Sequence, residues 1–301
     1  HFAFSDTAKK SYDRLIEHTN MVDTWLEKTG GSVATPAQGQ SEKISMKAAD
    51  ILPILRGVIG DANARFSGDR DYSMPVMDMR DGKNVQEFLA REDLASLSRR
   101  GVATPDHVIR TKGYPLHLTT EILSGGRESI SIAVEDFIAE YTAYFDANAS
   151  RFDGTKTMLQ PTPNLAWIEG VGAVGISADA KTTAAASDLA EQNIAAMTKG
   201  EACGGFYPLN ATGLFDMEYW SLEQAKLGKG KPPALQGKIV LVTGGGGAIG
   251  LATAQEFAAL GANVFLVDQE ATALDTALSE LGGNHGGIAL DITNAESADR
   301  T

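Results

Sequence analysis

The feature that most constrains the fold is a run of four glycines between an apolar stretch and an apolar helical pattern. Residues 238–242 read KIVLV, which is typical of a parallel strand buried in a sheet. Residues 243–250 read TGGGGAIG, and residues 251–260 have the composition of a helix. Strand, glycine loop and helix in this order predict a phosphate-binding turn in a doubly wound parallel sheet. Glycines let an anionic ligand approach the backbone N–H groups at a helix N-terminus.

Acidic residues after the loop favour a dinucleotide as the ligand. A second apolar run ends at Asp268, where a carboxylate would accept hydrogen bonds from ribose hydroxyls and repel a 2′-phosphate. We therefore expect NAD rather than NADP. A third strand-like run, residues 287–292, contains Asp291 where the adenine should lie, although a turn or N-cap role for Asp291 fits as well. The expected cofactor-binding residues are Gly244, Gly246, Gly247, Ala248, Ile249, Gly250, Asp268, Asp291 and Ile292.

Composition and charge exclude several classes of protein. With 301 residues, 43% of them hydrophobic and 22% charged, the chain is long and apolar enough for about two folded domains. A formal net charge of −13 argues against a nucleic-acid partner. No run of eighteen apolar residues and no leader pattern occur, so we expect no membrane partner and a cytoplasmic location. The one cysteine, Cys203, excludes an internal disulfide and is expected to be a buried, inert thiol.

The polar, Gly/Pro-rich residues 228–233 mark a domain boundary. We place a first α/β domain at 1–228, a linker at 229–235 and the start of the nucleotide domain at 236–301. Hydrophobic periodicity predicts helices at 6–28, 46–59, 85–99, 130–148, 178–197 and 215–227, a loop at 29–41, and strand-like pieces at 72–79, 129–134, 165–168 and 171–177.

Two distant segments share a short internal sequence similarity. Residues 4–9 (FSDTAK) and 176–181 (ISADAK) align at an offset of 172, and each reads as a strand end, a polar turn and a helix start. Duplication explains the three identities, and so does the shared chemistry of such a turn.

The glycine loop resembles the opening of the short-chain dehydrogenases/reductases, whose loop is written TGxxxGxG. Ala248 stands where that family has its middle glycine, and one added methyl is expected to be tolerated. The resemblance implies catalysis by a Ser, a Tyr and a Lys in YxxxK spacing. None of the seven tyrosines is followed four places on by Lys. We therefore assign no catalytic residue, expect that set beyond Thr301, and expect this piece alone to be inactive.

A second resemblance covers most of the remaining chain. Residues 101–112 (GVATPDHVIRTK) and 215–226 (FDMEYWSLEQAK) look like bifunctional proteins that join a class II aldolase/adducin-type domain to a short-chain dehydrogenase, similar to rhamnulose-1-phosphate aldolase/lactaldehyde dehydrogenase fusions. The resemblance implies a homo-oligomeric parent enzyme, cut at both ends here. That parent would cleave a ketose 1-phosphate and oxidise the aldehyde, or an alcohol, with NAD. The alternative is an NAD-dependent sugar or alcohol dehydrogenase with a non-catalytic, aldolase-like assembly domain.

The aldolase resemblance also implies a Zn²⁺ held by three His beside a Glu. In the internal alignment at an offset of 172, His1 lies opposite Ala173, two residues past the expected ligand position. We therefore assign no metal ligand. His1 itself is the remaining candidate. His107 and His117 lack a metal-site spacing, and His107 is expected to be structural or close to substrate.

Three basic residues have two interpretations. Lys112, Arg110 and Arg127 could bind a sugar phosphate, or they could form ordinary ion pairs at the surface.

Overall fold

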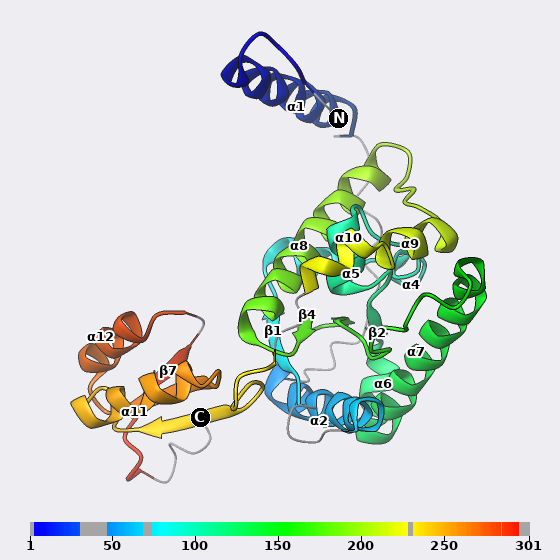
Figure 1. The fold of residues 1–301 in the computed structure, drawn as a ribbon. Helices are drawn as coiled ribbons and strands as arrows, with labels where there is room; N and C mark the ends of the chain where they lie inside the picture. Colours follow the sequence, from blue (N-terminus) through cyan, green and yellow to red (C-terminus); the bar gives the residue numbers. More distant parts are fainter. Residues whose placement is uncertain (1–2, 31–46, 69–73, 228–230, 284, 295–301) are drawn as a thin grey trace.

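The computed structural model describes residues 3–30, 47–68, 74–227, 231–283 and 285–294 (Figure 1). His1 and most of the predicted loop at 29–41 lie outside these ranges. The described chain forms two α/β units, each built on its own sheet. This confirms the predicted fold class, in which an aldolase-like α/β region precedes part of a doubly wound parallel sheet.

The larger unit contains a four-stranded mixed sheet in the order β1-β4-β3-β2. Strand β4 pairs antiparallel with β1 and β3, and β2 pairs parallel with β3. The strands are β1 (Val76–Arg80), β2 (Leu116–Leu118), β3 (Leu165–Ile168) and β4 (Gly172–Ser177). All of β3 and most of β4 are buried, because helices cover both faces of the sheet.

Helices α2 (Ala48–Ser67) and α7 (Gly126–Ala149) pack on one face of this sheet, where Ile51 and Ile130 are fully buried. Helices α3 (Lys83–Leu89) and α8 (Ala180–Ala202) cover the other face around Trp167. The remaining elements are α1 (Ala8–Gly30), α4 (Leu94–Leu97), α5 (Pro105–Thr111), α6 (Thr120–Ser124), η1 (Ser150–Phe152), α9 (Ala211–Glu218), α10 (Ser221–Gln224) and η2 (Ala225–Leu227).

The smaller unit contains a three-stranded parallel sheet in the order β5-β6-β7. Its strands are β5 (Ile239–Thr243), β6 (Asn263–Asp268) and β7 (Gly286–Ala289), joined by α11 (Ala248–Ala259) and α12 (Ala271–Leu281). Both helices pack on one face of the sheet in a single apolar cluster. On the other face Ile239 and Leu241 are 60% and 55% exposed, so the expectation of a strand buried on both sides is wrong for β5.

Two sequence-based predictions in the larger unit need correction, and two short elements have no counterpart among the predictions. Residues 129–134 are helical, because Ile130, Val134 and Phe137 recur at helical spacing and bury one face of α7. The helix predicted at 85–99 is two short helices, since α3 ends at Leu89 and an Arg91–Asp93 ion pair occupies the turn that follows. The periodicity did not predict α5 or β2, which are only seven and three residues long.

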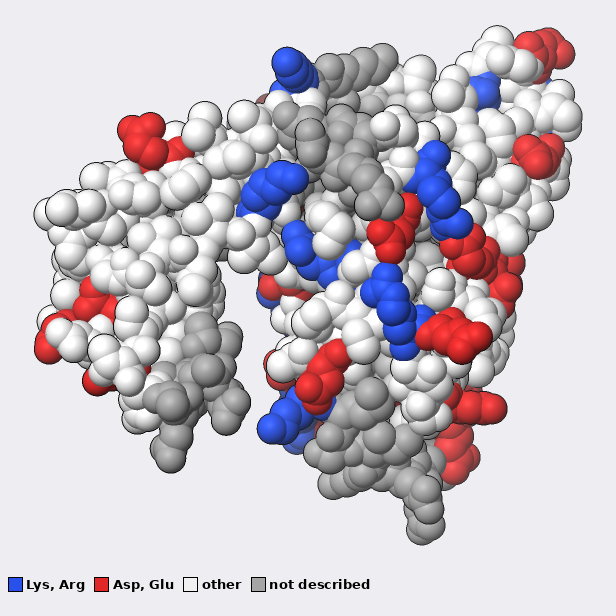
Figure 2. Space-filling model, turned by 90° about the horizontal axis from the view of Figure 1, so that it is seen from below, with Lys and Arg blue, Asp and Glu red and all other residues white. Residues whose placement is uncertain are grey.

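The two units meet at Arg56 of α2. Its guanidinium donates to the carbonyls of Pro75 and Gly237, at 2.8 Å in each case. Gly237 has a φ of +76°, and a Cβ there would lie 2.6 Å from the Met74 carbonyl oxygen. Figure 2 shows the notch between the units, with basic and acidic side chains intermixed beside it. Burial lowers the pKa of Arg56 from its usual range.

Candidate functional site

The glycine loop connects the end of β5 to the start of α11. Gly244 has a φ of +68°, and the amide of Gly247 donates to its carbonyl at 3.1 Å. Gly247 then occupies the N-cap of α11 and has no side chain that could cap the helix. The first N–H groups of a helix have no partner within it. The amides of Ala248, Ile249 and Gly250 therefore have no partner within the helix, at the end where the helix dipole favours negative charge.

Two of the glycines are required by close packing. A Cβ on Gly250 would lie 2.1 Å from the Gly244 carbonyl oxygen, and one on Gly245 would lie 2.8 Å from Cβ of Leu266. Gly247 is different, because a Cβ there would meet nothing closer than 3.4 Å. Ala248 is exposed, so its methyl group meets no packing obstacle. The loop thus requires glycine where it approaches β6 and α11, and tolerates the extra methyl at residue 248.

Asp268, the last residue of β6, lies against the loop. Its Oδ2 accepts a hydrogen bond from the Gly246 amide at 2.9 Å, and its Oδ1 accepts one from the Glu270 amide at 3.1 Å. The backbone adds a further connection, since the Gly245 amide donates to the Val267 carbonyl at 3.1 Å. The structure therefore brings the predicted phosphate cradle and the predicted ribose carboxylate together at one end of the parallel sheet.

Asp291 and Ile292 follow β7 at the same end of the sheet. The Leu290 amide donates to the Asp268 carbonyl at 2.7 Å, which extends the β6–β7 pairing to this point. The exposed Asp291 carboxylate accepts from the Thr293 hydroxyl at 2.7 Å and its amide at 2.9 Å, and these bonds lower the pKa of Asp291. Asp291 thus forms a turn, the second interpretation offered for it above. Ile292 is exposed.

A cavity of about 840 Å³ lies between the two units, and its lining includes neither the glycine loop nor Asp268. It is lined by Ile239, Asn263 and Gly286 at the amino ends of β5, β6 and β7. Asp268 and the glycine loop lie at the carboxyl ends of the strands, where ligands bind in open parallel sheets.

A group of buried ionisable residues occupies the larger unit, and no sequence pattern predicts it. Lys112 is buried, donates to the Gln160 carbonyl at 2.8 Å and lies 3.6 Å from the ring centre of Tyr141. It is neither a surface ion pair nor a phosphate ligand, so both interpretations offered for it are wrong. Arg127 does form a surface ion pair, with Asp61 at 2.9 Å.

Glu218 completes this buried group. It accepts hydrogen bonds from the Tyr141 hydroxyl at 2.7 Å and the Tyr144 hydroxyl at 3.0 Å. The Tyr219 hydroxyl lies 2.7 Å from that of Tyr141. Burial raises the pKa of Glu218 and lowers that of Lys112 to about 8, while the attraction between the two charges opposes both shifts. These residues come from distant segments, and no local pattern marks them as a group.

The histidines that the structure describes do not assemble a metal site. His107 is fully buried; its Nδ1 lies 2.7 Å from the Thr104 hydroxyl, and its Nε2 is buried without a hydrogen-bond partner among the described residues. His117 pairs with Glu169 at 3.0 Å, and burial lowers its pKa although the carboxylate opposes the shift. Among the residues that the structure describes, no three His, Cys, Asp or Glu side chains come close enough to hold a metal ion. The zinc implied by the aldolase resemblance therefore does not fit these residues.

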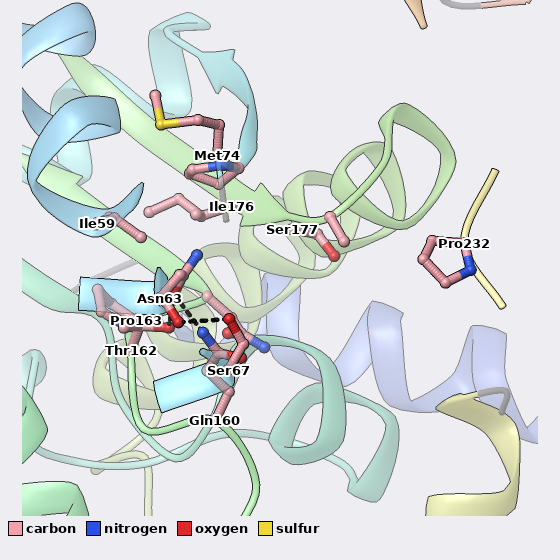
Figure 3. A pocket seen from close by; sticks show the side chains of 13 residues that line it. Ile59, Asn63, Ser67, Met74, Gln160, Thr162, Pro163, Ile176, Ser177 and Pro232 are labelled. Carbon is pink, nitrogen blue, oxygen red and sulfur yellow. Dashed lines mark hydrogen bonds between the residues drawn. The ribbon is translucent and has the colours of Figure 1, made fainter. Parts of the chain in front are cut away.

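Two smaller features of the larger unit are a cysteine and a cavity. Cys203 is half-exposed, so its predicted burial is wrong. A cavity of about 460 Å³ lies between α2, β4 and residues 160–164 (Figure 3). There the Asn63 side-chain oxygen accepts from the Gln160 amide at 2.6 Å and the Thr162 hydroxyl at 2.7 Å. Its described lining offers amides and hydroxyls without an acid or base, which suits binding of a polar molecule better than proton transfer.

Comparisons with known proteins agree with the division into two parts. Residues 46–227 match the family model for the second domain of class II aldolases, and residues 238–301 match that for short-chain dehydrogenases. An uncharacterized oxidoreductase, YuxG of Bacillus subtilis (strain 168), is 29% identical over 97% of this chain and 43% of its own length.

Other relatives match the smaller unit alone. Galactitol 2-dehydrogenase (L-tagatose-forming) of Cereibacter sphaeroides is 47% identical over 64 residues, which are 21% of this chain and 25% of the relative. D-threitol dehydrogenase of Mycolicibacterium smegmatis is 39% identical over 66 residues, which are 21% of this chain and 25% of the relative. The chain thus spans less than half the length of these curated relatives.

A solved structure shows the same local similarity. The citronellol catabolism dehydrogenase AtuB of Pseudomonas aeruginosa PAO1 is 41% identical over 21% of this chain and 28% of its own. Its TM-score of 0.20 is too low to bear on the arrangement of the two units. Within the described residues, no helix has the length and apolar character needed to cross a bilayer.

The packing around the loop predicts different outcomes at two glycines. Gly250→Ala should lower the free energy of unfolding by about 1–3 kcal/mol, because its Cβ would overlap the Gly244 carbonyl oxygen. Gly247→Ala should lower the free energy of unfolding by less than about 1 kcal/mol, because only the N-cap preference of the residue changes there. Urea denaturation followed by circular dichroism measures both. Equal losses of unfolding free energy in the two variants would contradict the loop geometry.

The buried lysine predicts a pH dependence of stability. The pKa of Lys112 falls from 10.5 to about 8 on folding, so above pH 8 the unfolded chain retains a proton that the folded chain has released. The stability of the wild type relative to Lys112→Met should therefore rise between about pH 7.5 and 9.5. Lys199→Met, at an exposed ion pair, should show no such rise. Urea denaturation at several pH values measures these stabilities. A difference in unfolding free energy between the wild type and Lys112→Met that stays constant from about pH 7.5 to 9.5 would contradict the prediction.

Proposed function

Given that the chain belongs to the class II aldolase family and continues into a short-chain dehydrogenase, we propose that its polypeptide is an NAD-dependent oxidoreductase. The cofactor is held by residues 243–250 and Asp268. The observation that carries this proposal is the 2.9 Å hydrogen bond between the Gly246 amide and the Asp268 carboxylate. This bond joins the glycine loop, which would bind the phosphates, to the carboxylate that would bind the ribose.

Each residue of the site has a role in this proposal. The amides of Ala248, Ile249 and Gly250 bind the diphosphate, and glycine at residue 250 lets α11 approach the loop. Asp268 accepts hydrogen bonds from the adenosine ribose hydroxyls, and its negative charge excludes a 2′-phosphate. The adenine lies beside Asp291 and Ile292. The nicotinamide supplies hydride-transfer chemistry when the cofactor is bound.

The substrate class follows from the relatives of the smaller unit. Two of them are named for oxidation of the polyols galactitol and D-threitol, which supports a sugar, polyol or aldehyde as the substrate here. No tyrosine in this chain is followed four residues later by lysine. The chain therefore supplies cofactor binding but not the proton donor that the family uses, and alone it should bind NAD weakly without turnover.

Aldol cleavage is the second candidate function, favoured by the match of residues 46–227 to the class II aldolases. In this version the parent enzyme cleaves a ketose 1-phosphate and its dehydrogenase part oxidises the released aldehyde. The zinc ligands would have to lie outside the described residues, so the larger unit itself serves in assembly or substrate binding. A cytoplasmic homo-oligomer is consistent with both candidates.

Metal analysis and a retro-aldol assay of the polypeptide expressed from its natural start codon separate the two candidates. Stoichiometric zinc together with cleavage of a ketose 1-phosphate would establish the coupled enzyme. Neither zinc nor cleavage, with intact NAD-dependent oxidation, would leave the larger unit with a non-catalytic role.

Cofactor preference tests the proposed role of Asp268 in the chain itself. We expect NAD to bind at least about tenfold more tightly than NADP, since a carboxylate at this position repels the 2′-phosphate. Asp268→Ser should remove most of that preference. Asp275→Ser makes the same charge change at an exposed residue of α12 and should retain it. Isothermal titration calorimetry with both nucleotides gives the ratios, and an unchanged ratio in Asp268→Ser would refute the assignment.

A further inference from the structure

A cavity of the larger unit, between α2, β4 and residues 160–164, has no role in the function proposed above (Figure 3). Its volume of about 460 Å³ lies within the range that is typical of small-molecule sites. None of the described residues that line it is charged or aromatic. The lining combines amide and hydroxyl groups with apolar side chains. This combination suits a small, neutral molecule that carries both hydroxyl and C–H groups.

Helix α2 forms one wall of this cavity through three residues spaced four apart. Ile59, Asn63 and Ser67 lie on one face of the helix, because four residues are close to one helical turn. Ile59 is buried, Asn63 is half-buried and Ser67 is exposed. The wall therefore changes from apolar at the inner end of the cavity to polar at its outer end.

The polar side chains that face α2 are oriented by Asn63. Its side-chain oxygen accepts hydrogen bonds from the Gln160 amide and the Thr162 hydroxyl, and Figure 3 shows the three side chains together. A hydroxyl that donates in this way also has lone pairs that accept, and a primary amide has two N–H groups and an oxygen. The cavity thus offers donors and acceptors side by side. A chain of hydroxyl groups requires this arrangement, because each hydroxyl both donates and accepts.

The segment that carries these groups is held in place without a ligand. Pro161 and Pro163 fix the backbone on both sides of residue 162. The Asn164 carbonyl accepts from the Ile176 amide at 2.9 Å, and the Asn164 side-chain amide donates to the Arg110 carbonyl at 3.1 Å. A preformed site of this kind costs a ligand little ordering entropy.

Apolar side chains form another side of the cavity. Met74, Ile59 and Ile176 lie together there, on one side of the group around Asn63 (Figure 3). Met74 lies directly against α2, since a Cβ on Gly60 would be 2.3 Å from its sulfur. A phosphate bound here would find no cation among the described lining residues, which makes its burial costly. A polyol avoids this cost, and its carbon chain presents C–H groups to the apolar side.

The cavity adjoins the amino end of β5, whereas the proposed cofactor lies at the carboxyl end. A Cβ on Gly237, two residues before β5 begins, would lie 2.6 Å from the carbonyl oxygen of Met74. The glycine loop follows β5, and Asp268 is the last residue of β6. A ligand in the cavity would therefore be bound apart from the nicotinamide.

We propose that this cavity is a second binding site, which holds a neutral polyol or sugar of about four to six carbons. The amide and hydroxyl lining carries the site itself. The choice of a polyol among neutral polar ligands rests on the substrate class proposed above. Binding at this site does not require NAD, so the two proposals can be tested separately.

Amide chemical shifts of the isotopically labelled chain test the site without NAD. We expect galactitol and D-threitol to shift the amides of residues 160, 162, 164 and 176–178, with dissociation constants at or below about 10 mM. Glycerol should bind at least about tenfold more weakly, because its shorter chain makes fewer hydrogen bonds. D-Fructose 1-phosphate should leave these amides unshifted, since its charge has no partner in the described lining.

Two variants with matched controls locate the bound polyol. Gln160→Ala removes a side-chain amide but keeps the carbonyl that accepts from Lys112, so it should weaken galactitol binding about three- to tenfold. Gln192→Ala, at an exposed glutamine of α8, should leave the affinity unchanged. Ala178→Trp should fill the cavity and abolish binding, whereas Ala195→Trp, at an exposed residue of α8, should not. If Ala178→Trp does not fold, the pair of glutamine variants decides the question.

Three results would overturn the proposal. The first is the absence of shifts at these amides with either polyol at about 100 mM. The second is equal affinity for galactitol and glycerol, which would indicate a general co-solvent effect. The third is tighter binding of D-fructose 1-phosphate than of galactitol at the same amides, which would make this a site for sugar phosphates.

A separate titration of the same chain with NAD distinguishes the failure of this site from the failure of the proposed function. A chain that binds NAD but neither polyol loses only the second site. A chain that binds the polyols but not NAD retains this site and contradicts the proposed cofactor.

Discussion

The proposed nucleotide site depends on the contact between the Gly246 amide and the Asp268 carboxylate. This bond fixes a flexible glycine loop against the end of a strand whose position is set by the sheet. It forms because Gly245 and Gly250 have no side chains, so the loop can lie against Leu266 and α11 can begin directly beside it. A methyl group at either position would separate the two halves of the site.

The two units use ionisable residues in opposite ways. In the larger unit Lys112 and Glu218 are buried among tyrosine hydroxyls, where they connect α7, α9 and the chain near residue 160. Such residues are costly to bury unless every polar atom is paired, so their placement here indicates a structural role. In the smaller unit Asp268 and Asp291 remain accessible at the carboxyl ends of the strands. The proposed cofactor contacts are therefore carboxylates that a ligand can reach, unlike the buried pair of the larger unit.

Sequence predicted the features that depend on neighbouring residues. The glycine loop, Asp268 and the strand at 165–168 were all predicted, because each is set by a short run of residues or a fixed spacing. The segment 129–134 was predicted wrongly, since its alternating apolar residues fit both a strand and the buried face of α7. The group around Lys112 and Glu218 could not be predicted, because only the tertiary fold brings residues so far apart in the chain together.

The most direct test of the central claim is a titration of isotopically labelled chain with NAD, followed by amide chemical shifts. We expect the largest shifts at residues 244–250 and at Asp268, with Asp291 and Ile292 shifting less and α7 and α9 unchanged. Shifts confined to the amino ends of the strands, around Ile239 and Asn263, or none at saturating NAD, would contradict the account.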